Sequence, residues 1–314
     1  LGGIMVKSTM KRAVLAKIEG TYGTDPTPTG VANAMRVNNL SVTPMNSDNL
    51  TRDYAGPYFR NFENIVANSH VKAEFEIELQ GSGAAGTAPA YGPLLRACAM
   101  GETVVADTSV TYAPVSAALE SVTMYFYNDG LVQKVTGLRG DFELTLNARA
   151  VPVLKFSMTG LYAGPIDGAL PTVTLTGFKA PVAAEKTNTT GFTFLGVTSH
   201  KLEALSVKAG NEVFYRNLVG GQEVIITDRK PTAEITIDAP AIATQDIFAA
   251  AIAGTTGSMA IQHGQSAGYI ATVTCGKVQP LNPAYEDASG TLMLKVPLIV
   301  LPTTGNDDMS IAFT

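Results

Sequence analysis

Three histidines and one glycine-rich segment are the parts of this chain whose residue types suggest chemistry. His70, His200 and His263 each stand alone, and none has the second histidine four residues further along that a zinc protease helix requires. Serine and aspartate are available in any protein of this length, so their presence does not by itself indicate a Ser-His-Asp triad. We therefore expect that the chain is not an enzyme and holds no metal.

The segment Gly81-Ser-Gly-Ala-Ala-Gly86 matches the G-x-G-x-x-G pattern of dinucleotide-binding loops, and Asp107 follows about twenty residues later. The strand before such a loop is normally buried on both faces, whereas residues 71–79 carry charges on one face. Pro89 and Pro93 also delay the helix whose N-terminus would hold the pyrophosphate. We interpret the segment as a flexible loop and expect no cofactor.

Carboxylates recur on one face of two predicted strands. Glu74, Glu76 and Glu78 alternate with apolar residues in the first half, and Glu234 and Asp238 take matching positions in the second. Side chains on one strand face lie about 7 Å apart and do not converge, which argues against a calcium site. One interpretation is a solvated strand face, and the other is a wall that faces an anion without binding it.

The segment 45–68 is long, lacks a regular apolar period and is rich in aromatic and charged residues. Loops of this length inside compact domains are usually functional or disordered. Exposed aromatic side chains mixed with arginine suit a protein–protein contact, while a self-packed Ω-loop is the competing interpretation. The contact residues that we predict are Arg52, Asp53, Tyr54, Tyr58, Phe59, Arg60 and Phe62.

The composition limits the classes of partner. The chain has 314 residues, of which 46% are hydrophobic and 16% charged, so we expect a large core and not a disordered chain. A net charge of −5 gives no general attraction to nucleic acid or anionic lipid. No segment reaches the roughly 18 apolar residues of a membrane helix, and the first ten residues lack the core of a signal peptide. We expect no membrane anchor, and buried free thiols at Cys98 and Cys275.

Alternation of apolar and polar residues dominates from residue 34 onward and predicts a mainly β protein. The clearest strand is 71–79, which has one apolar and one charged face. Asn128-Asp-Gly130 predicts a tight hairpin between strands at 122–127 and 131–135, because Asp-Gly tolerates the positive φ angles of such turns. Helices are predicted only at 91–100 and 245–253, each followed by a glycine.

The second half repeats the order of the first. Asn39-Leu-Ser-Val42 matches Ala204-Leu-Ser-Val207, 72–78 matches 232–238, and a helix and a hairpin follow each time. Such an ordered series predicts an internal duplication. We divide the chain into an N-terminal arm at 1–30, a first domain at 31–162, a connector at 163–195 and a second domain at 196–314.

Several of these segments resemble the major tail tube protein of long-tailed, siphovirus-like bacteriophages or prophages. They are Glu19 to Pro28, Glu74 through the glycine-rich loop to Cys98, Val110 to Val115 and the hairpin at Asn128-Asp-Gly130. The second half joins the resemblance through the duplication. The resemblance implies two tandem β-sandwich or partial-barrel domains, each with a short flanking helix and a long hairpin loop.

The resemblance also implies partners. Copies of such a protein assemble in the host bacterial cytoplasm into stacked rings, which form the tail tube of the virion and the conduit for DNA ejection. A two-domain chain would give a homotrimeric, pseudo-sixfold ring, with a hexamer as the alternative. A tape measure protein and a tail terminator would be further partners, and double-stranded DNA would pass without specific binding.

On this basis the predicted contact residues of 45–68 belong to an inter-ring loop, with 211–222 as its shorter counterpart. The arm at 21–30 would pack against a neighbouring copy. The lumen-facing residues implied are Glu74, Glu76, Glu78, Glu234 and Asp238.

Two other classes stay open at this point. A capsid or tail decoration protein, or a host adhesin, would also be built of β-sandwiches but would not stack into tubes. A carbohydrate-active enzyme on a β scaffold would need paired carboxylates and sugar-stacking aromatic residues, and this chain contains no Trp.

Overall fold

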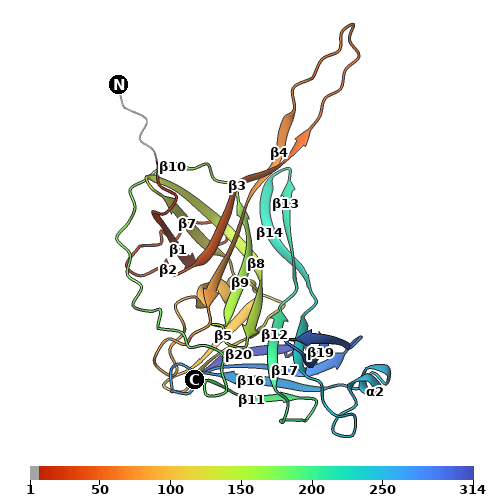
Figure 1. Ribbon diagram of the computed structural model, residues 1–314. Coiled ribbons are helices and arrows are strands. Elements are labelled where there is room, and N and C mark those ends of the chain that lie inside the picture. Colours follow the sequence, from red (N-terminus) through yellow and green to blue (C-terminus); the bar gives the residue numbers. More distant parts are fainter. Residues whose placement is uncertain (1–6) are drawn as a thin grey trace.

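A computed structural model describes residues 7–314 and shows a mainly β protein (Figure 1). Strands hold 51% of the residues and helices 4%, which confirms the predicted fold class. The first six residues of the predicted arm lie outside the described part. Within that part, no helix is long and apolar enough to cross a membrane.

One antiparallel sheet, which we call the long sheet, runs through both halves of the chain. Its strand order is β3–β4–β9–β8–β12–β15–β19–β18. The first four strands come from the first half, and the two halves meet where β8 pairs with β12. The strands are β3 (Asn38–Leu50), β4 (Ile65–Glu78), β9 (Val153–Leu161), β8 (Leu131–Asn147), β12 (Leu202–Lys208), β15 (Thr232–Asp238), β19 (Thr291–Val300) and β18 (Ala284–Ala288).

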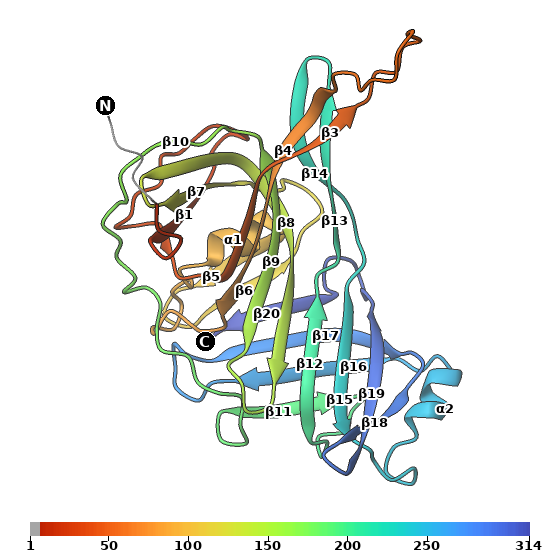
Figure 2. The ribbon, with the colours of Figure 1, turned by 45° about the horizontal axis from the view of Figure 1, so that its top comes forward.

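Two smaller groups of strands complete the two halves. The first contains β2 (Ala34–Met35), β1 (Arg12–Ile18), β7 (Val122–Asn128), the start of β8 and β10 (Ile166–Asp167). The second contains β11 (Thr189–Phe194), β16 (Gly257–His263), β17 (Ala271–Pro280), β20 (Met309–Phe313), β6 (Ser109–Pro114) and β5 (Met100–Val105). The hairpin β5–β6 of the first half therefore extends a sheet of the second half, which ties the halves together (Figure 2).

Corresponding strands pair in the same register in the two halves. Ser41 of β3 lies opposite Glu74 of β4, and Ser206 of β12 lies opposite Glu234 of β15. The next strand places Lys155 opposite Glu76 in the first half and Lys295 opposite Thr236 in the second. This agreement supports an internal duplication, although the domain limits stay a prediction.

Both short helices lie inside the predicted ranges but have different surroundings. Helix α1 (Gly92–Ala97) packs against β1, β5, β7 and β8, and its Leu94 and Leu95 are fully buried. Helix α2 (Ile247–Ile252) begins at Asp246, whose carboxylate accepts a hydrogen bond of 2.8 Å from the amide of Ala249. Only Ile247 of α2 is buried, and β17 is the strand that it contacts most.

The structure corrects the interpretation of residues 12–18 as part of an arm. They form β1, which pairs along its whole length with β7 and is buried over 13–16. The neighbouring segment 21–30 is held by its own chain, because the Lys17 ammonium donates to the carbonyl of Pro26 and the Tyr125 hydroxyl donates to Asp25. The apolar residues Ala13 to Ala16 follow one another without alternation, and the partner strand β7 is more than a hundred residues away, so the sequence does not reveal the pairing.

Candidate functional site

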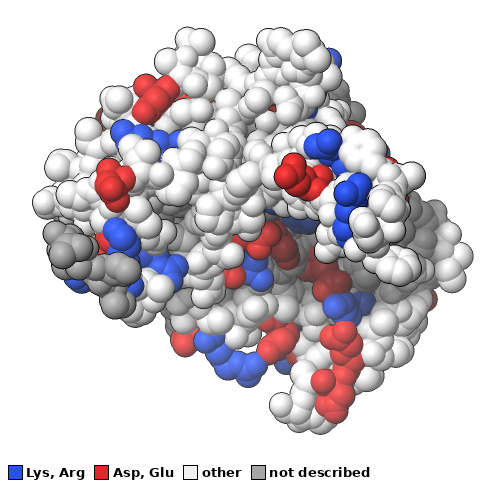
Figure 3. All heavy atoms as spheres, turned by 90° about the horizontal axis from the view of Figure 1, so that it is seen from above, with Lys and Arg blue, Asp and Glu red and all other residues white. Residues whose placement is uncertain are grey.

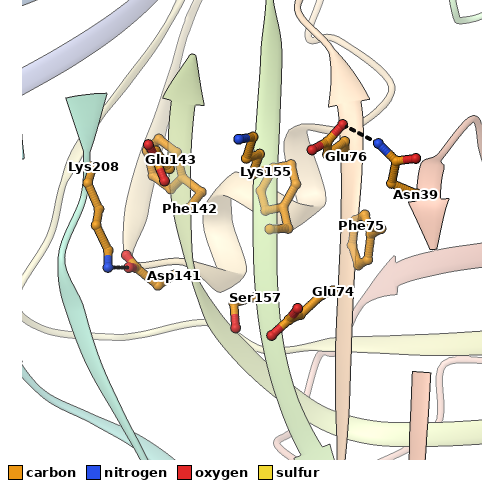
Figure 4. A pocket seen from close by; sticks show the side chains of 11 residues that line it. Asn39, Glu74, Phe75, Glu76, Asp141, Phe142, Glu143, Lys155, Ser157 and Lys208 are labelled. Carbon is orange, nitrogen blue, oxygen red and sulfur yellow. Dashed lines mark hydrogen bonds and ion pairs between the residues drawn. The ribbon is translucent and has the colours of Figure 1, made fainter. Parts of the chain in front are cut away.

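The polar face of the long sheet gathers side chains from both halves. Because side chains alternate along a strand, the register places Glu74 and Glu76 of β4 beside Lys155 of β9, which lies beside Glu143 of β8. Lys208 of β12 continues the row across the junction between the halves. Figure 4 shows these residues around an open cavity of about 260 Å³.

Several charged groups on this face have a nearby partner, which is an opposite charge for Lys208 and a neutral hydrogen-bond donor for Glu143 and Glu76. The Lys208 ammonium lies 3.8 Å from Asp141, and the Ser206 hydroxyl donates a hydrogen bond of 2.6 Å to Glu143. The Asn39 amide donates a bond of 2.7 Å to Glu76 (Figure 4). Glu74 has no ion-pair or side-chain hydrogen-bond partner among residues 7–314. It is the carboxylate of this row that is left to face solvent.

The second half carries the same mixture of charges. Lys295 of β19 lies 2.7 Å from Glu234 and 3.8 Å from Glu286, and Lys201 lies 3.1 Å from Asp238. In the first half, Arg36 lies 2.7 Å from Glu78. The five carboxylates predicted from the sequence thus share one face, but lysines from neighbouring strands stand among them. Figure 3 shows the acidic and basic atoms side by side in the hollowed part of the molecule.

Asp141 is an enclosed carboxylate of the face, with 15% of its side chain exposed. Desolvation raises the pKa of Asp141, while hydrogen bonds from backbone amides, including a bond of 2.9 Å from Asn211, act in the opposite direction. Within the part of the chain that the structure describes, no three His, Cys, Asp or Glu side chains gather as metal ligands. The face is thus a mixed polar surface on which ion pairs and hydrogen bonds hold part of the charge, while Glu74 and Lys155 have no such side-chain partner among the described residues.

The predicted contact loop extends well beyond the long sheet, between β3 and β4 (Figure 1). The guanidinium of Arg52 lies 5.2 Å from the ring centre of Tyr54, and that of Arg60 lies 4.7 Å from Phe62. Tyr54 and Phe62 also meet edge to face, with 5.6 Å between ring centres. Phe59 is fully exposed, as is most of Tyr58. Asp53 and Glu63 make no ion pair within the described chain.

A second hairpin, β13 (Asn211–Leu218) with β14 (Gly221–Arg229), connects β12 to β15 and packs on the first half. Asn211 is buried at its base, and its amide donates to the carbonyl of Cys98 at 2.8 Å and to that of Gly140 at 3.1 Å. Further along the hairpin, the guanidinium of Arg139 in β8 donates a hydrogen bond of 2.8 Å to the carbonyl of Val224. The tip exposes Leu218 and Val219. The strands of this hairpin pair up to Leu218 opposite Gly221, whereas those of the first hairpin pair only as far as Leu50 opposite Ile65 and leave a long loop between them.

The other motifs have structural roles. The glycine-rich segment 81–86 is a loop whose Gly83 amide donates to the carbonyl of Gly268, and no helix starts within it. Gly264-Gln-Ser-Ala-Gly268 has the G-x-S-x-G spacing of a nucleophile elbow, but it joins the two strands β16 and β17. An elbow requires a strand followed by a helix. His263 is buried, with its Nδ1 atom 2.9 Å from the hydroxyl of Thr189.

A family model for phage tail tube proteins matches residues 10–313, nearly the whole chain. The chain belongs to this family. A comparison with curated proteins gave no match. As a phage tail tube protein, the chain is a structural protein of the virion tail and associates with itself in the tube. This is a structural family and not an enzyme family.

The sequence placed Lys72 on the charged face of 71–79 but did not reveal three other basic members of the polar face of this tail tube protein. Lys155, Lys208 and Lys295 lie on strands β9, β12 and β19, which stand beside the acidic strands only in the folded sheet. A signal was present for Lys155, because it alternates with apolar residues in Val153 to Met158. Without the strand order, that signal does not indicate which face of which sheet the lysine joins.

Proposed function

We propose that copies of this chain join edge to edge into rings that stack to form the tail tube, the conduit through which DNA leaves the virion. A ring of three chains carries six similar units and is therefore pseudo-sixfold, with a ring of six chains as the alternative. A tape measure protein inside the tube and a terminator at its end are the further partners. Assembly takes place in the host bacterial cytoplasm.

The observation that carries this proposal is the state of the two edges of the long sheet. Within the described chain, β3 pairs only with β4 and β18 pairs only with β19. Figure 2 shows β3 and β18 in separate halves of the molecule. Free strand edges expose unpaired amides and carbonyls and readily pair with another chain. A joint of one copy's β18 with the next copy's β3 satisfies both edges and closes the sheet.

The internal joint β8–β12 serves as the template for this contact. There, Lys208 lies opposite Glu143 and Ser206 opposite Thr145. The repeat aligns Thr43 with Lys208. Lys155 and Lys295 are likewise matching residues, and Glu143 lies opposite Lys155 while Ala284 lies opposite Lys295. Ala284 therefore corresponds to Glu143.

The same register at the joint between chains sets Thr43 of one copy opposite Ala284 of the next. Two residues along, Ser41 lies opposite Glu286. This joint also sets a hydroxyl beside a carboxylate, directly across the two strands, whereas inside the chain Ser206 lies opposite Thr145 and reaches Glu143 diagonally.

The polar face of the long sheet is the surface that we assign to the lumen. The opposite face is buried, since Phe75 and Ile77 of β4 and Ile235 of β15 belong to the core. Carboxylates outnumber lysines on the polar face. Ion pairs hold Lys208, Lys295 and Lys201, whereas Lys155 and Lys72 make no ion pair within the described residues. DNA should pass along this wall without tight binding, because the excess of carboxylates repels phosphate and exceeds the two unpaired lysines.

The experiment is negative-stain electron microscopy of the purified chain over a range of concentrations. Hollow tubes of stacked rings support the proposal, and rotational averages of end views decide between three and six chains. A Ser41→Cys/Glu286→Cys variant should also form covalent rings on oxidation. Compact single particles at every concentration would overturn the proposal and favour a decoration or adhesion protein.

A further inference from the structure

An apolar pocket of about 450 Å³ lies at the base of the joint between the two halves. It is formed where β8 ends, β12 begins and the segment before β11 crosses between them. The apolar lining comprises Leu146, Ala148, Ala184, Phe192, Leu202 and Ile261. This volume falls within the range of about 300–1,000 Å³ that is typical of sites which bury a small molecule or a group of side chains.

The wall of the pocket is partly aromatic and its rim is charged. His200 lies edge-on to Phe192, with 6.5 Å between ring centres, and is fixed by a contact of 2.5 Å from its Nε2 atom to the side-chain oxygen of Gln245. Glu185 and Lys186 also line the pocket, and neither makes an ion pair within the described residues. The site thus offers an apolar floor with one free charge of each sign.

The loop between β3 and β4 has the complementary composition. Phe59 is fully exposed and has no aromatic or cationic partner in residues 7–314, whereas Tyr54 and Phe62 are held by arginines. Asp53 and Arg60 lie on either side of Phe59 in the loop. An exposed phenylalanine flanked by opposite charges is suited to burial in a contact whose rim carries charges of both signs.

The two features lie at opposite ends of the molecule. In Figure 1 the loop beyond β3 and β4 is at the top, whereas β11 and the start of β12, which border the pocket, are at the bottom. A feature at one end that complements a feature at the other produces a head-to-tail contact, and such contacts continue without closing. That is the geometry that stacking of rings requires.

We propose that Phe59 of one copy, with Tyr58 beside it, inserts into this pocket of a copy in the adjacent ring, with Arg60 facing Glu185 and Asp53 facing Lys186. The proposal rests on the proposed tube, for which it names the axial contact. The pocket lies at the joint between the two halves, so each chain offers this one pocket to one long loop.

Disulfide trapping in assembled tubes tests the contact. Cys98 and Cys275 are buried, so the thiols of a Phe59→Cys/Lys186→Cys variant are the exposed ones within the described chain. Mild oxidation of its tubes should give a ladder of covalent multimers on a non-reducing gel. The matched control, Phe59→Cys/Val105→Cys, places the second thiol at a half-exposed position of β5 outside the pocket and should give at least tenfold less ladder.

The alternative occupant is the tip of the second hairpin. A Val219→Cys/Lys186→Cys variant that forms the ladder, while the Phe59 variant does not, would assign the pocket to β13–β14 and overturn the proposal. Tubes of normal appearance in which neither pair cross-links would overturn it as well, while leaving the tube itself intact. A wild-type chain that never forms tubes instead refutes the proposed function.

A second variant tests the chemistry without new thiols. Phe59→Asp puts a charge into the apolar floor and should abolish stacking, so that single rings accumulate, whereas Phe59→Tyr should restore tubes. Because Phe59 is exposed in the free chain, both variants should unfold at the wild-type temperature. Tubes of normal length from Phe59→Asp would overturn the assignment.

Discussion

Helices α1 and α2 take matching places in the two halves, yet one is a core element and the other a surface element. Leu94, Leu95 and Ala97 of α1 are completely buried, and the carbonyl at its C-terminal end, that of Cys98, is bound by Asn211 of the second half. Ile252 at the end of α2 is 90% exposed. A position that is core in the first half is therefore surface in the second.

Other exposed apolar side chains surround α2. The ring of Phe248 lies tilted against that of Tyr285 of β18, with 5.4 Å between ring centres, and Tyr285, Leu292 and Ile252 are all largely exposed. This apolar patch borders the free edge of β18, where we propose that the next copy joins. The comparison teaches that the first half has its neighbour built into the chain, whereas the second half obtains its neighbour by assembly.

The largest expected effect contrasts truncations in the two helices. Leu95→Ala should lower the free energy of unfolding by about 2–5 kcal/mol, because it leaves a cavity in a closed core. Ile252→Ala should change it by less than about 0.5 kcal/mol, as surface substitutions usually do. Urea denaturation of the unassembled chain measures both. Similar losses in the two variants would contradict the contrast between core and surface.

A charged residue in the patch sharpens the comparison by acting on assembly alone. Ile252→Asp should leave the unfolding temperature of the free chain unchanged and raise the concentration needed for tube formation at least tenfold, which corresponds to about 1.4 kcal/mol per contact. Light scattering against concentration gives the threshold. Val104→Asp, at a half-exposed residue of β5 away from the patch, is the control and should polymerise normally.

The buried histidine of the second half gives a smaller, pH-dependent effect. Burial lowers the pKa of His263, so the folded chain disfavours its protonation. Its contribution to stability is complete above the ordinary value of about 6.5 and is lost as the pH falls from there through the lowered pKa. The melting temperature should drop between pH 8 and pH 5 more for the wild type than for His263→Gln. An equal drop in both would show that His263 is not the titrating group.

The smallest effect compares the two hairpins. Arg216 of β13 forms an exposed ion pair of 3.1 Å with Glu223, and Arg60 lies over Phe62 in the first loop. Arg216→Ala should cost about 0.5 kcal/mol or less and Arg60→Ala about 0.5–1 kcal/mol, because exposed pairs are weak. Thermal melts of the free chain measure both. A loss above 2 kcal/mol for Arg60→Ala would mean that the first loop is stabilised within its own chain.

The fold was predictable where the pattern is local. Alternation over 71–79 gave strand β4, Asn128-Asp-Gly130 gave the β7–β8 hairpin, and the two helices lie where they were expected. Strand β1 was missed because its partner β7 is distant in the chain. Strand β11 falls at 189–194 inside the predicted connector, where the polar run Thr187 to Thr190 hides its alternation.

The candidate site was predictable only in part. The spacing of Glu74, Glu76 and Glu78 predicts that they share one strand face. The repeat extends this prediction to Glu234 and Asp238. Their lysine partners depend on the order of strands in the sheet, which is a non-local property. Strand β8 illustrates the difficulty, since its first part pairs with β7 and its later part with β9 and β12. One alternating run of seventeen residues thus serves two sheets.

The internal joint between β8 and β12 has a consequence for inheritance. In a ring built from a one-domain protein, every substitution appears at all contacts at once, and both sides of each contact must tolerate it. Here the joint Lys208–Glu143 and the free edge at Tyr285 are encoded by separate codons. A substitution can therefore alter the joint inside the chain and leave the proposed joint between chains unchanged, or the reverse. In a chain with two fused copies, the residues at the two kinds of joint in the proposed ring can change independently of each other.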